Sequence, residues 1–303
     1  MSNTLTPMIP TLIATEAIEL LTSRSGFLGR VRVETTQQAE LKGGDTVVIQ
    51  KQVGSFTPTN VSYASAASAQ GITVPSVNLT FANHKEVKIS ANELESRIAQ
   101  GNLTRILDLT VPGMIDGLVT LVDASLGALY TSATNNIGTA GAPITDDLVR
   151  EGVSLLADEK VPLDVPGAVN LVVSPQGYFR DLMAIDRYVL ANQSGNTEAM
   201  RGGKIPSQYN IGVDYTHNYT DATGKHGLLW HRDAMTIGFI EFEAANKYGG
   251  AAVEEAIVTD PATGLSLRVQ KYYDATLRTW FYQMDVKWGV AVTDADRMVD
   301  VIH

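Results

Sequence analysis

Residues 265–292 read LSLRVQKYYDATLRTWFYQMDVKWGVAV, and this stretch predicts one long β-hairpin. In its second half every even position from Trp280 to Val292 is apolar, while the odd positions between them mostly are not. Successive side chains of a strand point to opposite faces, so the alternation indicates a strand with one buried face. The side chains predicted to form the core of this strand are Trp280, Tyr282, Met284 and Trp288.

The turn of this hairpin predicts its register. A turn centred on Asp274-Ala275 places Val269 opposite Trp280 and Leu267 opposite Tyr282, so that both apolar rows share one face. A four-residue loop with the same pairing fits equally well. The second strand would span about 40 Å at roughly 3.3 Å per residue, and it is far longer than the mean strand of about five to six residues. We expect so long a ribbon in a subunit that must reach its neighbours.

The composition bounds the size and chemistry of the protein. The 303 residues are 44% hydrophobic, which is enough for a sizeable core in one large domain or two smaller ones. The net charge of −10 argues against a surface that grips nucleic acid along its length. No cysteine is present, which excludes a disulfide framework and a thiolate nucleophile. The longest apolar run, 111–130, contains Asp116 and Asp123 and is not expected to cross a membrane.

The segments before the hairpin predict an arm, an extended loop and a long helix. Residues 1–42 form an arm with one short helix, and no signal segment is expected there. Residues 43–90 hold two extended runs around a tip of small residues, a loop that cannot bury its own faces and needs a neighbour. Residues 103–133 are mostly helical, with a kink or a fresh start at Pro112-Gly113.

Two capping signals predict helix starts. Ser90 as N-cap with Glu93 three residues later forms a capping box. Asp146-Asp147 resembles a catalytic carboxylate pair, but its place just before an apolar-periodic run favours a helix N-terminus, where negative charge is stabilised. From residue 144 the pattern alternates between helices and short strands, so the whole chain is predicted to be α+β.

No constellation of residues predicts catalysis. His217, His226 and His231 lie close in sequence, but no cysteine or helically spaced carboxylate accompanies them, so surface or structural roles are favoured over metal ligation. The aromatic row of the hairpin could stack on single-stranded nucleic acid, yet its strict alternation favours a buried core face. Neither catalytic, cofactor-binding nor metal-binding residues are therefore predicted, and an enzyme is not expected.

The order of segments resembles the HK97-fold major capsid proteins of tailed bacteriophages. Residues 3–12 are similar to the N-terminal arm of coat proteins of the P22 type. Residues 44–49, Gly-Asp-Thr-Val-Val-Ile, are similar to the start of the family's extended E-loop. Three C-terminal stretches, 260–268, 285–289 and 299–302, are similar to its peripheral-domain strands. The resemblance covers essentially the whole chain by layout, and the order of the motifs carries it.

The resemblance implies an HK97-like capsid fold with five parts. They are an N-terminal arm (1–42), an E-loop (43–90), a peripheral domain with the spine helix (91–137), an axial domain (138–250) and the peripheral-domain hairpin (251–303). It implies that Lys51, Phe56, Tyr63 and Ala66 of the E-loop contact an adjacent subunit. It also implies that Asn192, Asn196 and Arg201 line the capsomer axis. A covalent cross-link from an E-loop lysine is not expected.

The function implied is that of a major capsid protein, a structural component of the virion. Hexamers and pentamers of the chain would form an icosahedral shell around double-stranded DNA, which it would hold loosely. The implied partners are other copies of the chain, a separate scaffolding protein and a portal, with a decoration protein as a further candidate. Assembly would take place in the host cytoplasm, with no membrane. The alternatives are an encapsulin-like nanocompartment shell, a carbohydrate-binding β-protein and, least favoured, a metal hydrolase using the histidines.

Overall fold

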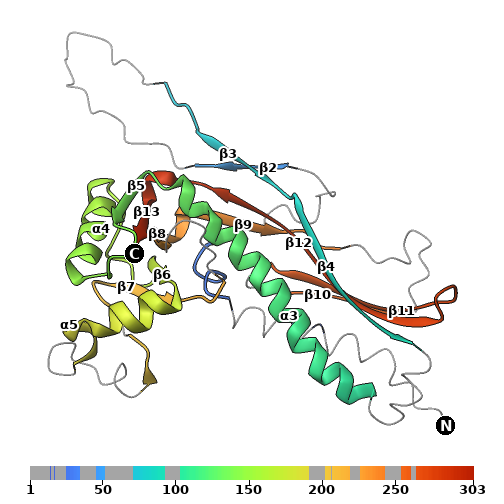
Figure 1. The fold of residues 1–303 in the computed structure, drawn as a ribbon. Coiled ribbons are helices and arrows are strands. Elements are labelled where there is room, and N and C mark those ends of the chain that lie inside the picture. Colours follow the sequence, from blue (N-terminus) through green and yellow to red (C-terminus); the bar gives the residue numbers. More distant parts are fainter. Residues whose placement is uncertain are drawn as a thin grey trace.

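The computed structural model describes residues 14, 17, 25–34, 46–51, 71–92, 103–190, 202–205, 207–218, 226–242, 254–260 and 264–303. These residues form a large sheet, a small sheet, a two-stranded ribbon and one long helix that lies along the large sheet (Figure 1). The chain is α+β, as predicted.

The large sheet is built around β12 (Thr279–Val292), which has 14 residues. The strand order is β1 (Arg32–Glu34), β9 (Met235–Phe239), β12, β11 (Ser266–Asp274) and β10 (Glu254–Thr259). Along the edge that β9 leaves free, β12 pairs with β4 (Asn83–Asn92). The long strand predicted from the alternating sequence is confirmed, and its length lets three other strands bind to it.

The predicted register of the β11–β12 hairpin is wrong by four residues. Val269 lies opposite Met284, and Leu267 lies opposite Val286. The turn comprises residues 275–278, because the Asp274 carboxylate accepts hydrogen bonds from the backbone N–H groups of the second and third of them, at 2.8 and 3.1 Å. Since the offset is even, both apolar rows still share one face.

The helix α3 (Leu103–Gly127) covers that face of the sheet, and the short 3-10 helix η2 (Ala128–Ser132) extends it. Met284, Val286 and Trp288 share one buried core with the helix side chains Ile115, Leu118, Val122 and Leu126. The Trp288 indole N–H donates to Ser125 Oγ at 3.2 Å. The core of the large sheet therefore lies between β12 and α3.

The opposite face of β12 is buried at positions that were expected to face water. Asp285 is fully buried, and Arg268 satisfies its carboxylate with two hydrogen bonds of 2.5 and 3.1 Å. Ala291 is buried under the ribbon of β2 (Thr46–Gln50) and β3 (Ser76–Thr80). This face of β12 has a polar pattern in the sequence, although other parts of the same chain cover it.

The helix α3 runs without interruption through Pro112, so a fresh start at Pro112-Gly113 is wrong. Among the described residues, 112–132 form the one helical segment that is long and apolar enough to cross a membrane, a property shared by core helices of soluble proteins. Here one face of the segment contributes to the core of the large sheet.

The capping box predicted at Ser90 is also wrong. Ser90 and the two residues after it belong to β4 and lie opposite Phe281, Trp280 and Thr279 of β12. The long edge of β12 offers a continuous row of backbone hydrogen-bond partners, which outweighs a local preference for a helix start. Glu93, the other half of the predicted box, lies outside the described residues.

The small sheet has the order β5 (Asn135–Gly138), β13 (Met298–Ile302), β8 (His226–His231), β6 (Val169–Val173) and β7 (Ile211–Tyr215). Its core includes residues of α4 (Asp146–Asp158) and of a broken helical region. The broken region consists of η3 (Gly177–Asp181), η4 (Leu182–Ala184) and α5 (Asp186–Val189).

The chain crosses twice between the sheets near the C-terminal strands. Only η5 (Arg232–Ala234) separates β8 of the small sheet from β9 of the large one, and η7 (Ala295–Arg297) leads back to β13. The backbone N–H groups of Thr293 and Asp294 both donate to Ala234 O, at 2.8 and 3.0 Å, which ties the two crossings together. The domain boundary expected at residue 250 therefore does not separate the two sheets.

Candidate functional site and assembly surfaces

The residues expected to act in assembly fall into two groups. Phe56, Tyr63, Ala66, Asn192, Asn196 and Arg201 lie outside the described residues, so their roles stay predictions. Lys51 follows β2, where its backbone N–H donates to Pro75 O at 2.8 Å and closes the described part of the ribbon.

The aromatic row of β12 belongs to the interior. Tyr282, Met284 and Trp288 are buried, and Trp280, near the hairpin turn, is half-buried. Tyr273 packs against Trp280 with ring centroids 5.2 Å apart, and Lys271 Nζ lies 5.2 Å from the Trp280 centroid. The outer end of the hairpin thus keeps a partly open aromatic surface, while the inner end is core.

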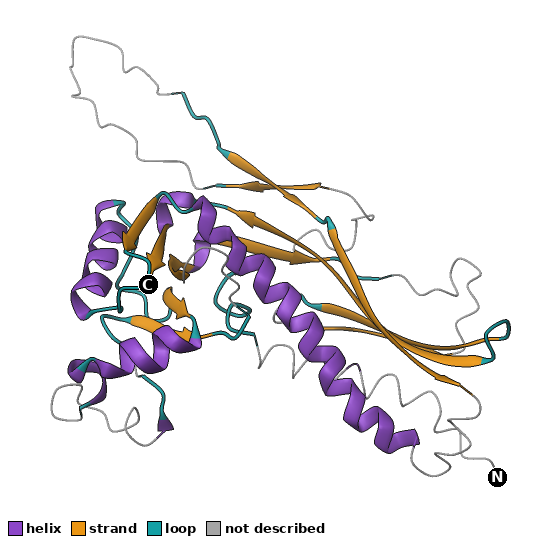
Figure 2. Ribbon diagram, viewed as in Figure 1, coloured by secondary structure: helices purple, strands orange, loops and turns teal. Residues whose placement is uncertain are grey.

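The ribbon of β2 and β3 is seated on its own chain (Figure 2). Val47, Ile49, Leu79 and Phe81 are buried against Ile240 and Ala291 of the large sheet. The expectation that this loop cannot bury its own faces is therefore wrong for its root.

Beyond the root the loop does expose apolar side chains. Ile72 is 67% exposed and Val74 is 46% exposed, both on the segment that leads into β3. Val48 is exposed on the outer face of β2. These side chains form an apolar surface that the described part of the subunit leaves uncovered.

A buried carboxylate joins three distant segments. Asp123 of α3 is 1% exposed and accepts hydrogen bonds from Ser25 Oγ, from Gly26 N at 2.9 Å and from Thr216 Oγ1 at 3.1 Å. Asn218 Nδ2 lies 3.3 Å from the same carboxylate. Asp123 thus fixes the N-terminal segment and the loop after β7 to the long helix, a role that sequence reasoning missed. The only signal for it was its place as one of two acidic residues in an apolar run.

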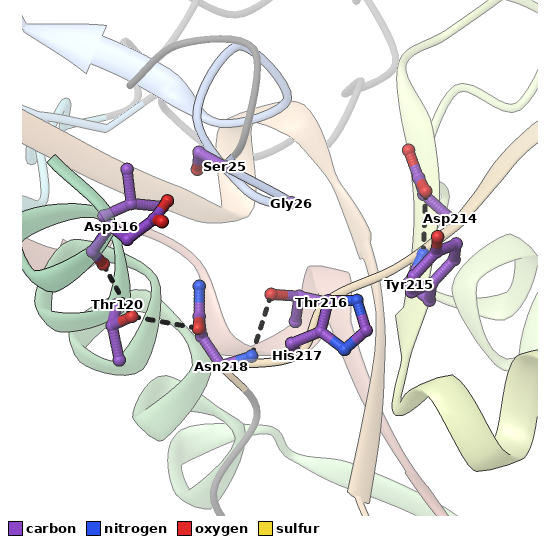
Figure 3. A pocket seen from close by; sticks show the side chains of 10 residues that line it. Ser25, Gly26, Asp116, Thr120, Asp214, Tyr215, Thr216, His217 and Asn218 are labelled. Atoms are coloured by element: carbon purple, nitrogen blue, oxygen red, sulfur yellow. Dashed lines mark hydrogen bonds between the residues drawn. The ribbon is translucent and has the colours of Figure 1, made fainter. Parts of the chain in front are cut away.

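A polar pocket of about 480 Å³ opens beside this junction (Figure 3). Asp116 and Thr120 of α3 line one side, and the residues after β7 line the other. Thr120 Oγ1 is 3.1 Å from Asn218 Oδ1, so a hydrogen bond spans the pocket wall. Across the pocket, the carboxylate of Asp214 is paired with Arg30. The arrangement joins segments, and its charged groups already have partners within the chain.

The three histidines do not converge. His226 Nδ1 lies 2.9 Å from the Asp300 carboxylate, and its ring stacks on Tyr130 at 4.1 Å. His231 Nδ1 accepts from Asp233 N at 3.3 Å, and burial lowers its pKa. His217 is exposed at the pocket. Within the described part of the chain, no three side chains gather as metal ligands.

The helix-cap interpretation of Asp146 and Asp147 is confirmed. Thr145 is the N-cap of α4, and its side chain accepts from Leu148 N at 3.3 Å, while both aspartates lie in the first turn. Asp146 also accepts from Arg187 Nη1 at 3.0 Å and from Tyr209 Oη at 2.8 Å. Asp146 thus anchors α4 to two other segments of the small-sheet module.

The fold matches solved structures of phage capsids, although no protein-family model and no curated protein matches the sequence. The structure described as Mycobacterium phage Che8 is 18% identical to this chain, with a TM-score of 0.66. The match covers 90% of this chain and 89% of that one. The capsid of cyanophage P-SCSP1u is 11% identical with a TM-score of 0.60, over 90% of this chain and 86% of that one. This chain has the HK97-like capsid fold.

A virus-like particle from Pyrococcus furiosus shares the HK97-like fold. It is 9% identical, with a TM-score of 0.53 over 96% of this chain and 98% of that one. In the terms of this fold, α3 is the spine helix, and β2 with β3 is the root of the E-loop. The closer resemblance to coat proteins of the P22 type stays a prediction.

Proposed function

We propose that the chain is a major capsid protein of a tailed phage, and that it assembles into the hexamers and pentamers of an icosahedral shell around double-stranded DNA. One observation carries the proposal beyond the fold. The E-loop has a root buried on its own sheet, and beyond this root it exposes Ile72 and Val74. Apolar surface on an outstretched segment is stabilised only when another molecule covers it.

The role proposed is mechanical, and no catalysis is assigned to it. Each E-loop would cover one neighbour, and many modest contacts would add up because every subunit is held at several places at once. The net charge of −10 suits loose contact with packaged DNA, since a protein that grips phosphates needs excess lysine and arginine. A separate scaffolding protein, a portal and decoration proteins are proposed partners, with assembly in the host cytoplasm.

A nanocompartment shell filled with protein is the second candidate, because a virus-like particle shares the fold. Shell contents distinguish the two: DNA or an empty expandable shell supports a phage head, whereas a small uniform cage with protein cargo supports the second candidate. We do not propose carbohydrate binding, since Tyr282 and Trp288 of the aromatic row are buried in the core and only its outer end at Trp280 is partly open. The separate environments of the histidines likewise disfavour a metal hydrolase.

Electron microscopy of purified protein at rising concentration, with polyethylene glycol as a crowding agent, tests the proposal. We expect shells or capsomers from the natural chain and from Val165→Asp, a matched change at a 51% exposed valine on the loop between α4 and β6. The double variant Ile72→Asp, Val74→Asp should keep the thermal midpoint but form no shells, because charges would enter the E-loop contact. A natural chain that stays monomeric under every condition would overturn the proposal.

A further inference from the structure

Two glycines face each other across adjacent strands of the large sheet. Gly238 of β9 and Gly289 of β12 are register partners. They lie on the face opposite α3, because the next residue toward the N-terminus, Trp288, points into the core with that helix. Neither glycine has a positive φ, so its backbone conformation does not require glycine. What requires glycine at both positions is space.

The connection between β3 and β4 occupies that space. A Cβ atom on Gly289 would lie 2.4 Å from Thr80 O and 3.2 Å from Phe81 Cα. A Cβ atom on Gly238 would lie 2.8 Å from Leu79 Cδ2 and 3.0 Å from the Phe81 ring. At Gly289 the obstacle is backbone, which no side-chain rearrangement can remove, whereas at Gly238 it is the end of two side chains.

The contact lies where the chain passes from β3 of the ribbon to β4 of the large sheet. Up to Thr80 it forms the ribbon that lies on the sheet, and from Asn83 it forms β4 and pairs with Trp288 of β12 (Figure 1). Leu79 and Phe81 are fully buried at this crossing, with Ile240 and Ala291 beside the glycines. The backbone at Thr80 therefore rests directly on the sheet.

We propose that Gly238 and Gly289 form a seat that sets the angle at which the E-loop leaves the subunit, and that this angle decides whether subunits close into a shell. The inference rests on the proposed capsid function. A lift of about 1 Å at one end of a root about 15 Å long moves Ile72, four residues beyond the other end, by about 1 Å. Close-packed contacts between subunits do not absorb such a displacement.

The test compares alanine substitutions at three glycines. Gly289→Ala pushes against backbone, and Gly238→Ala pushes against side chains. Gly71→Ala is the matched control, because its Cβ would meet no atom of the described residues within 4 Å although it lies in the same loop. Amide hydrogen exchange of unassembled protein measures how firmly the loop root is held on the sheet, and electron microscopy shows whether shells form. Protection of β11 in the same experiment shows whether each variant is folded.

We expect at least tenfold faster exchange in 46–50 and 76–82 for Gly289→Ala, a smaller increase for Gly238→Ala, and no change for Gly71→Ala. Closed shells should be lost in Gly289→Ala and in Gly238→Ala and kept in Gly71→Ala. Adding Leu79→Val to Gly238→Ala removes the nearest obstructing atom and should restore shells, which a general loss of stability would not allow.

Unchanged exchange at the loop root in Gly289→Ala would overturn the inference, and so would normal shells from a variant with a loosened root. If Gly289→Ala fails to fold, Gly238→Ala and its Leu79→Val rescue decide by the same criteria. If the natural chain forms no shells, the proposed function fails, while the exchange measurement still decides whether the glycines hold the loop.

Discussion

Asp123 shows how one residue can set the relation between modules. It sits on the spine helix, yet its donors come from an N-terminal segment almost one hundred positions earlier and from a loop almost one hundred positions later. A buried carboxylate is costly unless hydrogen bonds satisfy its oxygens, and here the donors do so. The same contacts hold the small-sheet module against α3.

Replacing Asp123 with alanine should lower the free energy of unfolding by about 2–4 kcal/mol, because several buried donors lose their acceptor. Urea denaturation measures the change. The control is Asp147→Ala, which removes a carboxylate whose side chain is 85% exposed and whose ion pair with Arg150 lies on the surface. That control should cost less than about 1 kcal/mol. Equal losses in the two variants would contradict the role given to Asp123.

His231 should make the fold sensitive to mild acid. Burial lowers the pKa of its imidazole from the ordinary value of 6.5; nearby Asp233 opposes this shift and Arg297 adds to it. The folded state then binds fewer protons than the unfolded state. The contribution of neutral His231 to the free energy of unfolding is therefore complete above pH 6.5 and is lost as the pH falls through the folded-state pKa.

The variant His231→Asn keeps an acceptor for Asp233 N and cannot be protonated in this range. Its free energy of unfolding should therefore fall less than that of the natural protein between pH 7 and pH 5. Denaturation curves at each pH provide the comparison. Parallel pH profiles for the natural protein and His231→Asn would rule out this role.

At the scale of elements, the long hairpin combines a predictable strand with an unpredicted turn. Its alternating pattern specifies the buried face, while the Asp274 side chain selects a four-residue turn. The last turn residue, Arg278, has φ of +52°, in the left-handed region where a side chain costs energy.

Arg278→Gly should therefore stabilise the protein by about 1 kcal/mol, since glycine adopts this conformation without a steric penalty. Thermal unfolding would show a higher midpoint. The control Thr276→Gly lies in the same turn but at a position without positive φ, so it should lower the midpoint by adding freedom to the unfolded chain. A lower midpoint in both variants would mean that the backbone of Arg278 is not strained.

At the scale of the whole molecule, the two sheets and the helix form a body from which the E-loop extends (Figure 2). The root of the loop belongs to the body, because Val47, Ile49, Leu79 and Phe81 are buried in one cluster with Ile240 and Ala291. The body should therefore fold without the rest of the loop.

Replacing residues 52–74 with Asn-Gly would close β2 and β3 as a two-residue hairpin, the loop length that suits their antiparallel register. This variant should unfold within a few degrees of the natural protein, because the described residues of the removed segment, 71–74, contribute nothing to the three buried clusters. It should form no shells by electron microscopy. Closed shells from the shortened chain would show that the E-loop is dispensable for assembly.

The pattern of residues along the chain predicted the elements whose signals are local. Alternation from Trp280 to Val292 indicated the strand, the apolar spacing indicated the spine helix, and Asp146 with Asp147 marked the start of α4. These signals are reliable because periodicity and capping depend on neighbours within a few positions. Together with the order of segments they were sufficient for the fold.

Tertiary structure alone decided which segments meet. Ser90 carries a helix-start signal yet belongs to a strand, and Asp285 lies on an apparently polar face yet is buried. The strand β9 precedes residue 250 yet belongs to the large sheet, and β13 follows that residue yet belongs to the small one. The pairing of Gly238 with Gly289 and the donors of Asp123 are likewise invisible in sequence. In each case the deciding energy comes from partners far along the chain, and no local pattern records which partner a buried edge, face or carboxylate will find.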